Sequence, residues 1–221
     1  MEQQAAPSQA AKELIGVSAY TNFTTFTRIA AAAELTPDVS LKLALAGQAV
    51  AEYERYGVLD RAATRSGLDI QDLMSPFVPV IDEFHRRTRA ADWIEGILKA
   101  YVGDGLISDL HRMLAQRIES TEPKMGALIT STLPDHDEEE VFLQALRQAL
   151  MASPDRAGRL ALYGRMLLGE AMSRARAALR RAQALADLTG VDPGPLREPT
   201  VVLAQLAKAH QDRMGVLGLA T

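Results

Sequence analysis

The sequence contains no cysteine, and this absence removes several kinds of chemistry at once. Without thiols the chain can form neither a disulfide, nor a thiolate metal site, nor a cysteine nucleophile. The polar N-terminal stretch MEQQAAPSQAAKE also lacks the basic and apolar regions of a secretory signal. We therefore expect a cytoplasmic protein.

Long apolar runs and an excess of positive charge are missing as well. No stretch approaches about 18 uninterrupted apolar residues, so we expect no membrane span. The chain has 24 Lys and Arg against 28 Asp and Glu. This balance argues against a nucleic-acid-binding protein with a largely basic surface. It also has no glycine-rich phosphate loop and no Gly-x-Ser-x-Gly or His-Glu-x-x-His motif.

Aromatic residues make up only 5% of the chain, and apolar residues do not alternate with the period of a strand. The 221 residues are 48% hydrophobic, which is enough for one large helical domain. We expect a single domain over residues 1–221, with a core bundle at about 8–152 and extra C-terminal helices at about 153–216.

Caps and prolines mark the expected helices. Ser8 is a predicted N-cap, Pro37 a predicted first-turn residue, and Gly67 a predicted C-cap. Residues 68–88 are predicted to be a crossover connection with one shorter helix. Four long helices with this crossover predict an all-α, ferritin-like bundle. The helices are expected at about 8–35, 37–66, 90–118, 122–152 (interrupted at Pro134) and 153–188, with a loop at 189–199 and a last helix from about 200.

Polar side chains on apolar helix faces are candidates for a site, because burial is costly unless they are paired or ligated. In AEYERY, residues 51–56, Glu52 and Arg55 are three residues apart and share one otherwise apolar face. The same criterion selects Asp104 on the third long helix, Asp135 and Glu138 on the fourth, and the uncharged Asn22 and Thr27 on the first.

Four segments carry a resemblance that covers most of the chain: ELIGVSAY (13–20), AEYERYGVLDRAATRSGLD (51–69), DWIEGILKAYVGDGL (92–106) and AGRLALYGRMLLGEAMS (157–173). The chain resembles the ferritin-like proteins related to the tRNA methylthio-isopentenyl-adenosine hydroxylase, especially their actinobacterial ferritin-like fold-containing branch. The resemblance implies a ferritin-like bundle. In intact members it also implies a non-haem di-iron oxygenase site with a Glu, Glu-x-x-His, Glu, Glu-x-x-His ligand pattern.

This chain departs from the ligand pattern, so the resemblance implies a degenerate di-iron site. None of its four histidines stands at the Glu-x-x-His spacing. The helix-one glutamate falls at Asn22 or Thr27, the first Glu-x-x-His becomes Glu52-x-x-Arg55, the second becomes Asp135-x-x-Glu138, and Asp104 keeps the carboxylate of the third helix.

We hypothesise that Arg55 replaces part of the charge of a metal and pairs with Glu138 or Asp135, because a guanidinium is always charged and has five donors. One cation cannot neutralise four acids. Some of these acids must then be protonated, or the site is wet, or it takes one hard cation through oxygen ligands. The alternatives are that Arg55 reaches solvent at the bundle edge, that DHDEEE (135–140) is a solvated face, and that Asp104 belongs to a bend. Any metal would be held by Glu52, Asp104, Asp135 and Glu138.

Three functions follow as alternatives. The leading one is a non-redox scaffold or binding protein without a cofactor. The others are an iron or manganese oxygenase with a rearranged carboxylate-rich site, acting on tRNA or a small molecule, and a metal-free acid/base enzyme. A homodimer is the default expectation for such a bundle. Transfer RNA as a partner rests on the family resemblance alone, since the arginines of HRRTR (85–89) and SRARAALRRAQ (173–183) are typical of solvated faces.

Overall fold

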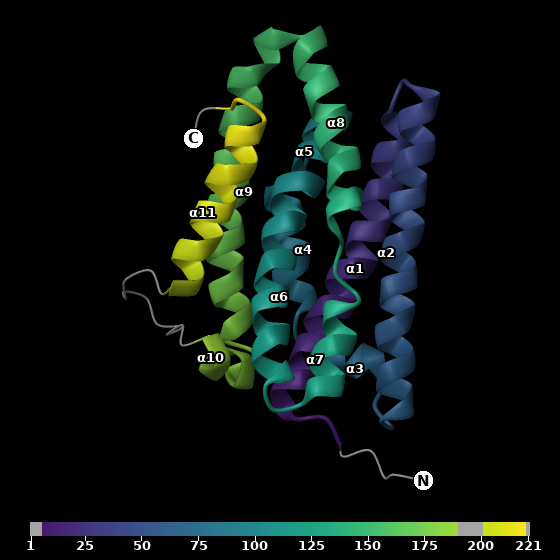
Figure 1. Ribbon diagram of the computed structural model, residues 1–221, viewed down its shortest axis with the longest axis vertical. Coiled ribbons are helices and arrows are strands. Elements are labelled where there is room, and N and C mark those ends of the chain that lie inside the picture. Colours follow the sequence, from purple (N-terminus) through teal and green to yellow (C-terminus); the bar gives the residue numbers. More distant parts are fainter. Residues whose placement is uncertain (1–5, 190–200, 220–221) are drawn as a thin grey trace.

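The computed structural model describes residues 6–189 and 201–219. All of its regular elements are helices, and the described residues contain no strand, which confirms the all-α prediction. The long helices lie side by side along the long axis of the molecule (Figure 1). In the described part of the chain no helix is long and apolar enough to cross a membrane.

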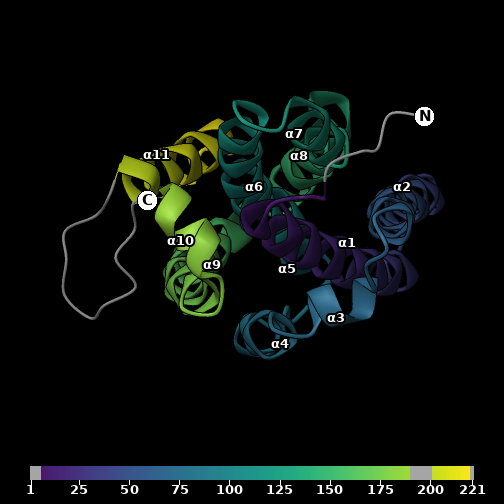
Figure 2. The same cartoon turned by 90° about the horizontal axis from the view of Figure 1, so that it is seen from below.

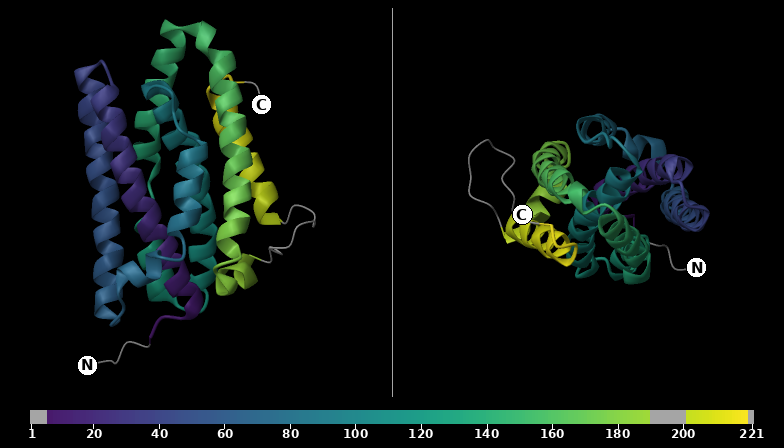
Figure 3. Two further views of the ribbon diagram at one scale, coloured as in Figure 1. Left: turned by 180° about the vertical axis from the view of Figure 1, so that it is seen from behind. Right: turned by 90° about the horizontal axis from the view of Figure 1, so that it is seen from above.

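The first two helices form a hairpin that lies at one side of the molecule (Figures 1 and 3). Helix α1 covers Gln9–Leu35 and α2 covers Val39–Arg65. Ser8 caps α1 by accepting from the backbone N–H of Ala11, as predicted. Asp38 caps α2, so Pro37 precedes the N-cap and does not lie in the first helical turn as the sequence predicted.

The crossover contains two short helices where the sequence predicted one. Gly67 ends α2 with a φ of +71°, a conformation that favours glycine. Helix α3 then covers Ile70–Met74, and α4 covers Val78–Arg87. The Asp69 side chain caps α3, and Pro79 lies in the first turn of α4, so both helix starts have a local cause in the sequence.

The third expected helix is a continuous rod whose middle turn is wider than an α-helix. Helix α5 covers Trp93–Leu98, the π-helix η1 covers Lys99–Asp104, and α6 covers Gly105–Glu119. The fourth expected helix is broken around Pro134 into α7, Pro123–Thr130, and α8, His136–Ala152.

The additional C-terminal helices pack into the same apolar core as the helices before them. A 3-10 turn, η2, covers Pro154–Arg156; α9 covers Ala157–Leu179, α10 Gln183–Thr189 and α11 Val201–Val216. Helix α9 thus ends before residue 188, and most of the predicted loop 189–199 lies outside the described residues. Viewed along the bundle, α6 lies between the α1–α2 hairpin and α9–α11 (Figure 2). Leu160 and Leu167 of α9 are fully buried in the same apolar cluster as residues of α1, α2, α5 and α8.

The second apolar cluster lies where α1, α3, α6 and α10 meet. Gly16 of α1 determines how closely α3 can approach. A Cβ atom built at Gly16 would lie 2.1 Å from the carbonyl oxygen of Leu73 in α3. The backbone of α3 therefore lies directly against α1 at this point, and only glycine fits at position 16.

We predict that Gly16→Ala destabilises the protein by about 2 kcal/mol or more, because the new methyl group meets backbone atoms that cannot turn away. Gly47→Ala is the matched control, since Gly47 is exposed in α2 with open space around its Cβ position. That change should stabilise the helix by about 0.5–1 kcal/mol. Urea unfolding of both variants measures the difference, and an equal effect of the two changes would contradict the close packing of α1 on α3.

Candidate functional site

Arg55 of α2 connects two carboxylates across the bundle. Its Nη1 atom donates to Oε1 of Glu52 at 2.9 Å, and its Nη2 atom donates to Oε2 of Glu138 on α8. The side chains of Arg55 and Glu52 are only 12% and 11% exposed. The guanidinium thus lies between α2 and α8 and does not extend into solvent.

The position of Glu138 follows from the way α8 begins. Asp135 is the N-cap, and its side chain accepts from the backbone N–H of Glu138 at 3.0 Å. The Glu138 side chain accepts in return from the backbone N–H of Asp135 at 2.9 Å, which completes a capping box. Glu138 is therefore held both by the helix start and by Arg55. Asp135 itself is exposed, so the structure does not bring it into the bundle interior.

A second, partly buried pair connects α1 to the π-helix. The Nη2 atom of Arg28 lies 2.8 Å and 2.9 Å from the two carboxylate oxygens of Asp104, and it also donates to the hydroxyl of Thr25 at 3.0 Å. Asp104 is the last residue of η1, and π-helical turns often occur at functional sites. Asp104 thus pairs with Arg28 and not with Arg55.

Of the two residues that the sequence selected on helix one, only Asn22 lies on the inner face. Thr27 is exposed, and its hydroxyl donates to the carbonyl of Thr24 in its own helix. Asn22 is buried and lines the small cavity beside Glu52. The functional candidate that was missed is Arg28. Arg28 follows Thr25 by three residues and Thr21 by seven, and both threonines are buried. This spacing places Arg28 on the inner face of α1 and could have identified it from the sequence.

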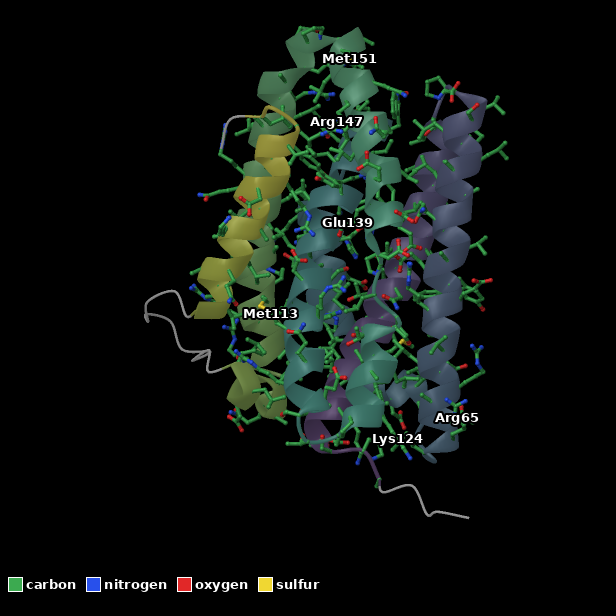
Figure 4. All side chains as sticks on the ribbon, viewed as in Figure 1. Arg65, Met113, Lys124, Glu139, Arg147 and Met151 are labelled. Carbon is green, nitrogen blue, oxygen red and sulfur yellow. The ribbon has the colours of Figure 1, made fainter. Side chains whose placement is uncertain are left out.

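A third network continues from α8 to the C-terminal helix. Arg213 of α11 donates to Asp109 of α6 and lies 3.2 Å from Oε1 of Glu139. Glu139 lies near the middle of the length of the molecule (Figure 4). A Cβ atom at Gly105 would lie 2.8 Å from Nε of Arg213, so the glycine makes room for this side chain. The acidic run 135–140 is thereby divided between different faces and different partners.

The pKa of Glu52 depends on two opposing influences, which are burial and the charge of Arg55. Desolvation raises the pKa of Glu52 to about 7, and the neighbouring Asp104 and Glu138 act in the same direction. Arg55 lowers this pKa, but less than burial raises it. Near neutral pH, Glu52 is therefore part neutral, and the two guanidiniums of Arg28 and Arg55 nearly balance the remaining negative charge.

The space beside these pairs is small. A cavity of about 30 Å³ is lined by Asn22, Gln48, Glu52, Asp104 and neighbouring residues. This volume admits water but no substrate of metabolite size.

The fold and this arrangement of polar residues can now be compared with known proteins. The chain matches the model of a family described as a ferritin-like domain of actinomycetes, over residues 7–192. It belongs to this ferritin-like family. The match confirms the ferritin-like bundle that the helix lengths and the crossover predicted. No curated protein matches the chain at a significant level.

Ferritin-like carboxylate proteins hold two metal ions in the bundle centre with glutamates and Glu-x-x-His motifs. The residues of this ferritin-like protein do not fit that centre. Glu52, Glu138 and Asp104 each accept hydrogen bonds from a guanidinium, which places a permanent positive charge beside the oxygens that a metal would bind. Within residues 6–189 and 201–219, no three His, Cys, Asp or Glu side chains converge in the manner of metal ligands.

The histidines with described side chains are used elsewhere in the ferritin-like bundle. The His111 ring bonds to the hydroxyl of Ser18 at 3.2 Å, and burial lowers its pKa to about 4. His85 contacts Thr24 at 3.2 Å, on the side of α1 that faces α4. His210 lies on α11 next to Gly164. None of the three adds a nitrogen ligand to Glu52 or Asp104.

We predict that Arg55→Ala lowers the free energy of unfolding by about 3–5 kcal/mol, because the change leaves Glu138 and Glu52 buried without a counter-charge. Arg61→Ala is the matched control, since Arg61 is an exposed residue of the same helix. It should cost less than about 1 kcal/mol. Urea unfolding at neutral pH measures both values. A loss of less than about 1 kcal/mol in the Arg55 variant would show that the ion pairs of Arg55 do not stabilise the fold.

The raised pKa of Glu52 predicts a specific pH dependence. Because the folded value of about 7 exceeds the ordinary 4.5, the folded protein binds the extra proton between these two pH values. The contribution of Glu52 to stability is therefore full below about pH 4.5 and is lost as the pH rises through 7, by up to about 3 kcal/mol. Glu52→Gln should match the parent near pH 4.5 and exceed it in stability at pH 8. Parallel curves of unfolding free energy against pH would contradict the raised pKa.

Proposed function

We propose that this ferritin-like protein has exchanged the metal centre of its fold for buried arginine–carboxylate pairs and works as a non-redox binding protein or scaffold. The observation that carries the proposal is the pair of guanidiniums, Arg28 on Asp104 and Arg55 on Glu52 and Glu138. A guanidinium stays protonated at any physiological pH, so it supplies a permanent positive charge where a metal would otherwise be needed.

The relation to the tRNA hydroxylase-like branch is part of this proposal and rests on the sequence segments given above. A role for tRNA itself finds little support in the charges of the surface. Arg86 and Arg87 both pair with Glu83, and Arg174 lies 3.7 Å from Glu170. Arginines that are already paired with acids on their own surface form a weak patch for phosphate groups.

An acid/base enzyme at the bundle centre is the less favoured alternative. Glu52 has the raised pKa that such a role needs. However, the adjoining cavity of about 30 Å³ gives no room for a substrate to reach it. The binding role is therefore better placed in a larger cavity elsewhere on the molecule.

The metal content of the protein tests the proposal. Protein purified without chelator should carry less than about a tenth of an ion per chain, before and after soaking with ferrous iron or manganese, because Arg28 and Arg55 already supply positive charge beside the carboxylates. Elemental mass spectrometry measures this ratio. One or two ions per chain that disappear in Glu52→Gln would overturn the proposal, and the oxygenase alternative would then lead.

A further inference from the structure

A cavity of about 490 Å³ is lined by Arg28 but by none of Glu52, Asp104 and Glu138. It is formed by the C-terminal half of α1, the end of α4, the connection 88–92 and helix α5. Its volume lies within the usual range for small-molecule sites. Apolar side chains make up most of its wall: Ile29, Ala31, Ala32, Leu35, Ala90, Ala91 and Trp93.

The charges of this cavity are mainly positive and incompletely neutralised. Arg28, Arg89 and Lys99 line it together with one acid, Asp92. Asp92 is already engaged, because it caps α5 and pairs with Arg159 outside the cavity wall. Within the described part of the chain, neither Arg89 nor Lys99 forms an ion pair.

Lys99 is the innermost of these cations and only 4% exposed. Its Nζ atom donates to the carbonyl oxygen of Thr88 at 2.9 Å and lies 5.2 Å from the centre of the Phe84 ring. Burial and the charge of Arg28 lower the pKa of Lys99 to about 7. A buried ammonium without a carboxylate partner is costly, and an anion entering the cavity would remove that cost.

Two buried nitrogen atoms of the cavity residues also have no hydrogen-bond partner in the described structure: Nε of Arg28 and Nδ1 of His85. Both atoms are covered by surrounding protein atoms and are not exposed to the open space of the cavity. Thr24 gives its single hydroxyl proton to a backbone carbonyl, so it accepts from Nε2–H of His85. Nδ1 is then left as an acceptor, so recognition of a negative charge falls to Lys99 and Arg89 and not to His85.

From this geometry we infer that the cavity binds an amphipathic carboxylate, whose charged group pairs with Lys99 and Arg89 and whose apolar part contacts Trp93 and the alanines of α1. The inference deepens the binding role in the proposed function. It needs no assumption about the bundle centre, so ligand binding and metal content can fail separately.

Trp93 provides a direct readout, because it is the one tryptophan of the sequence and it lines the cavity. Octanoate is the probe, and octan-1-ol and octylammonium are its neutral and cationic counterparts. We expect octanoate to change the fluorescence of Trp93 and to release heat in calorimetry. It should bind at least about tenfold more tightly than octan-1-ol, since a charge-assisted hydrogen bond contributes at least that factor.

Three variants connect the binding to the named residues. Arg89→Gln changes an exposed side chain, and Lys99→Met leaves the Thr88 carbonyl bonded to the hydroxyl of Tyr163 at 2.8 Å. Each should weaken octanoate binding about tenfold while octan-1-ol binding stays unchanged. Arg86→Gln is the matched control, because Arg86 is an exposed arginine three residues from Arg89 that does not line the cavity. It should bind octanoate like the parent.

Three results would overturn the inference. One is equal affinity for octanoate and octan-1-ol, which would leave an apolar groove without a charge-recognising end. The second is an absence of octanoate binding by both fluorescence and calorimetry, while the parent protein remains folded by circular dichroism. The third is a loss of octanoate binding in Arg86→Gln as large as that in Arg89→Gln, which would show that the cavity is not the site.

Discussion

The arrangement of this bundle depends on how the carboxylates in its centre find a counter-charge. Glu52, Asp104 and Glu138 come from three different helical segments and would repel one another if left alone in the interior. Arg28 and Arg55 resolve this by pairing with them across helix boundaries. Removing one partner of such a buried pair costs several kcal/mol, so each guanidinium ties two helices together.

The irregular parts of the backbone are where these pairs are positioned. The π-helical turn places Asp104 at its end, in contact with Arg28. The break around Pro134 allows α8 to begin at Asp135, so that Glu138 falls in the first turn and reaches Arg55. A regular helix through either segment would rotate the following side chains by a different amount. The π-helical turn and the break around Pro134 therefore both place a carboxylate where an arginine can pair with it.

Much of the fold could be predicted from local signals. Ser8 and Gly67 delimit helices where the sequence indicated, because caps act through hydrogen bonds and φ angles of the adjacent residues. Glu52 and Arg55 were found because a spacing of three residues places both on one helix face. These are properties of a short stretch of chain and need no knowledge of the tertiary structure.

The partners across the bundle could be predicted only in part. Asp135 and Glu138 have the same spacing as Glu52 and Arg55, but the capping box uses Asp135 at the helix start, where it is exposed. Arg28 was missed because it precedes an alanine-rich stretch and reads as an ordinary surface arginine. Its role depends on η1 being π-helical, since that turn determines where Asp104 points. Sequence periodicity assumes a regular helix and cannot supply this rotation.

The same charges determine which part of the site can respond to conditions. Arginine does not lose its proton in proteins, so the positive side of the balance is fixed. Glu52 is the carboxyl group whose pKa is raised to about 7, which makes its protonation the variable that changes the net charge of the centre near neutral pH. Arg28 contacts Asp104 with Nη2, while the same residue lines the larger cavity. An anion held by Lys99 and Arg89 in that cavity would lie near the guanidinium that pairs with Asp104, so Arg28 is the side chain through which the charge of the cavity would act on the bundle centre.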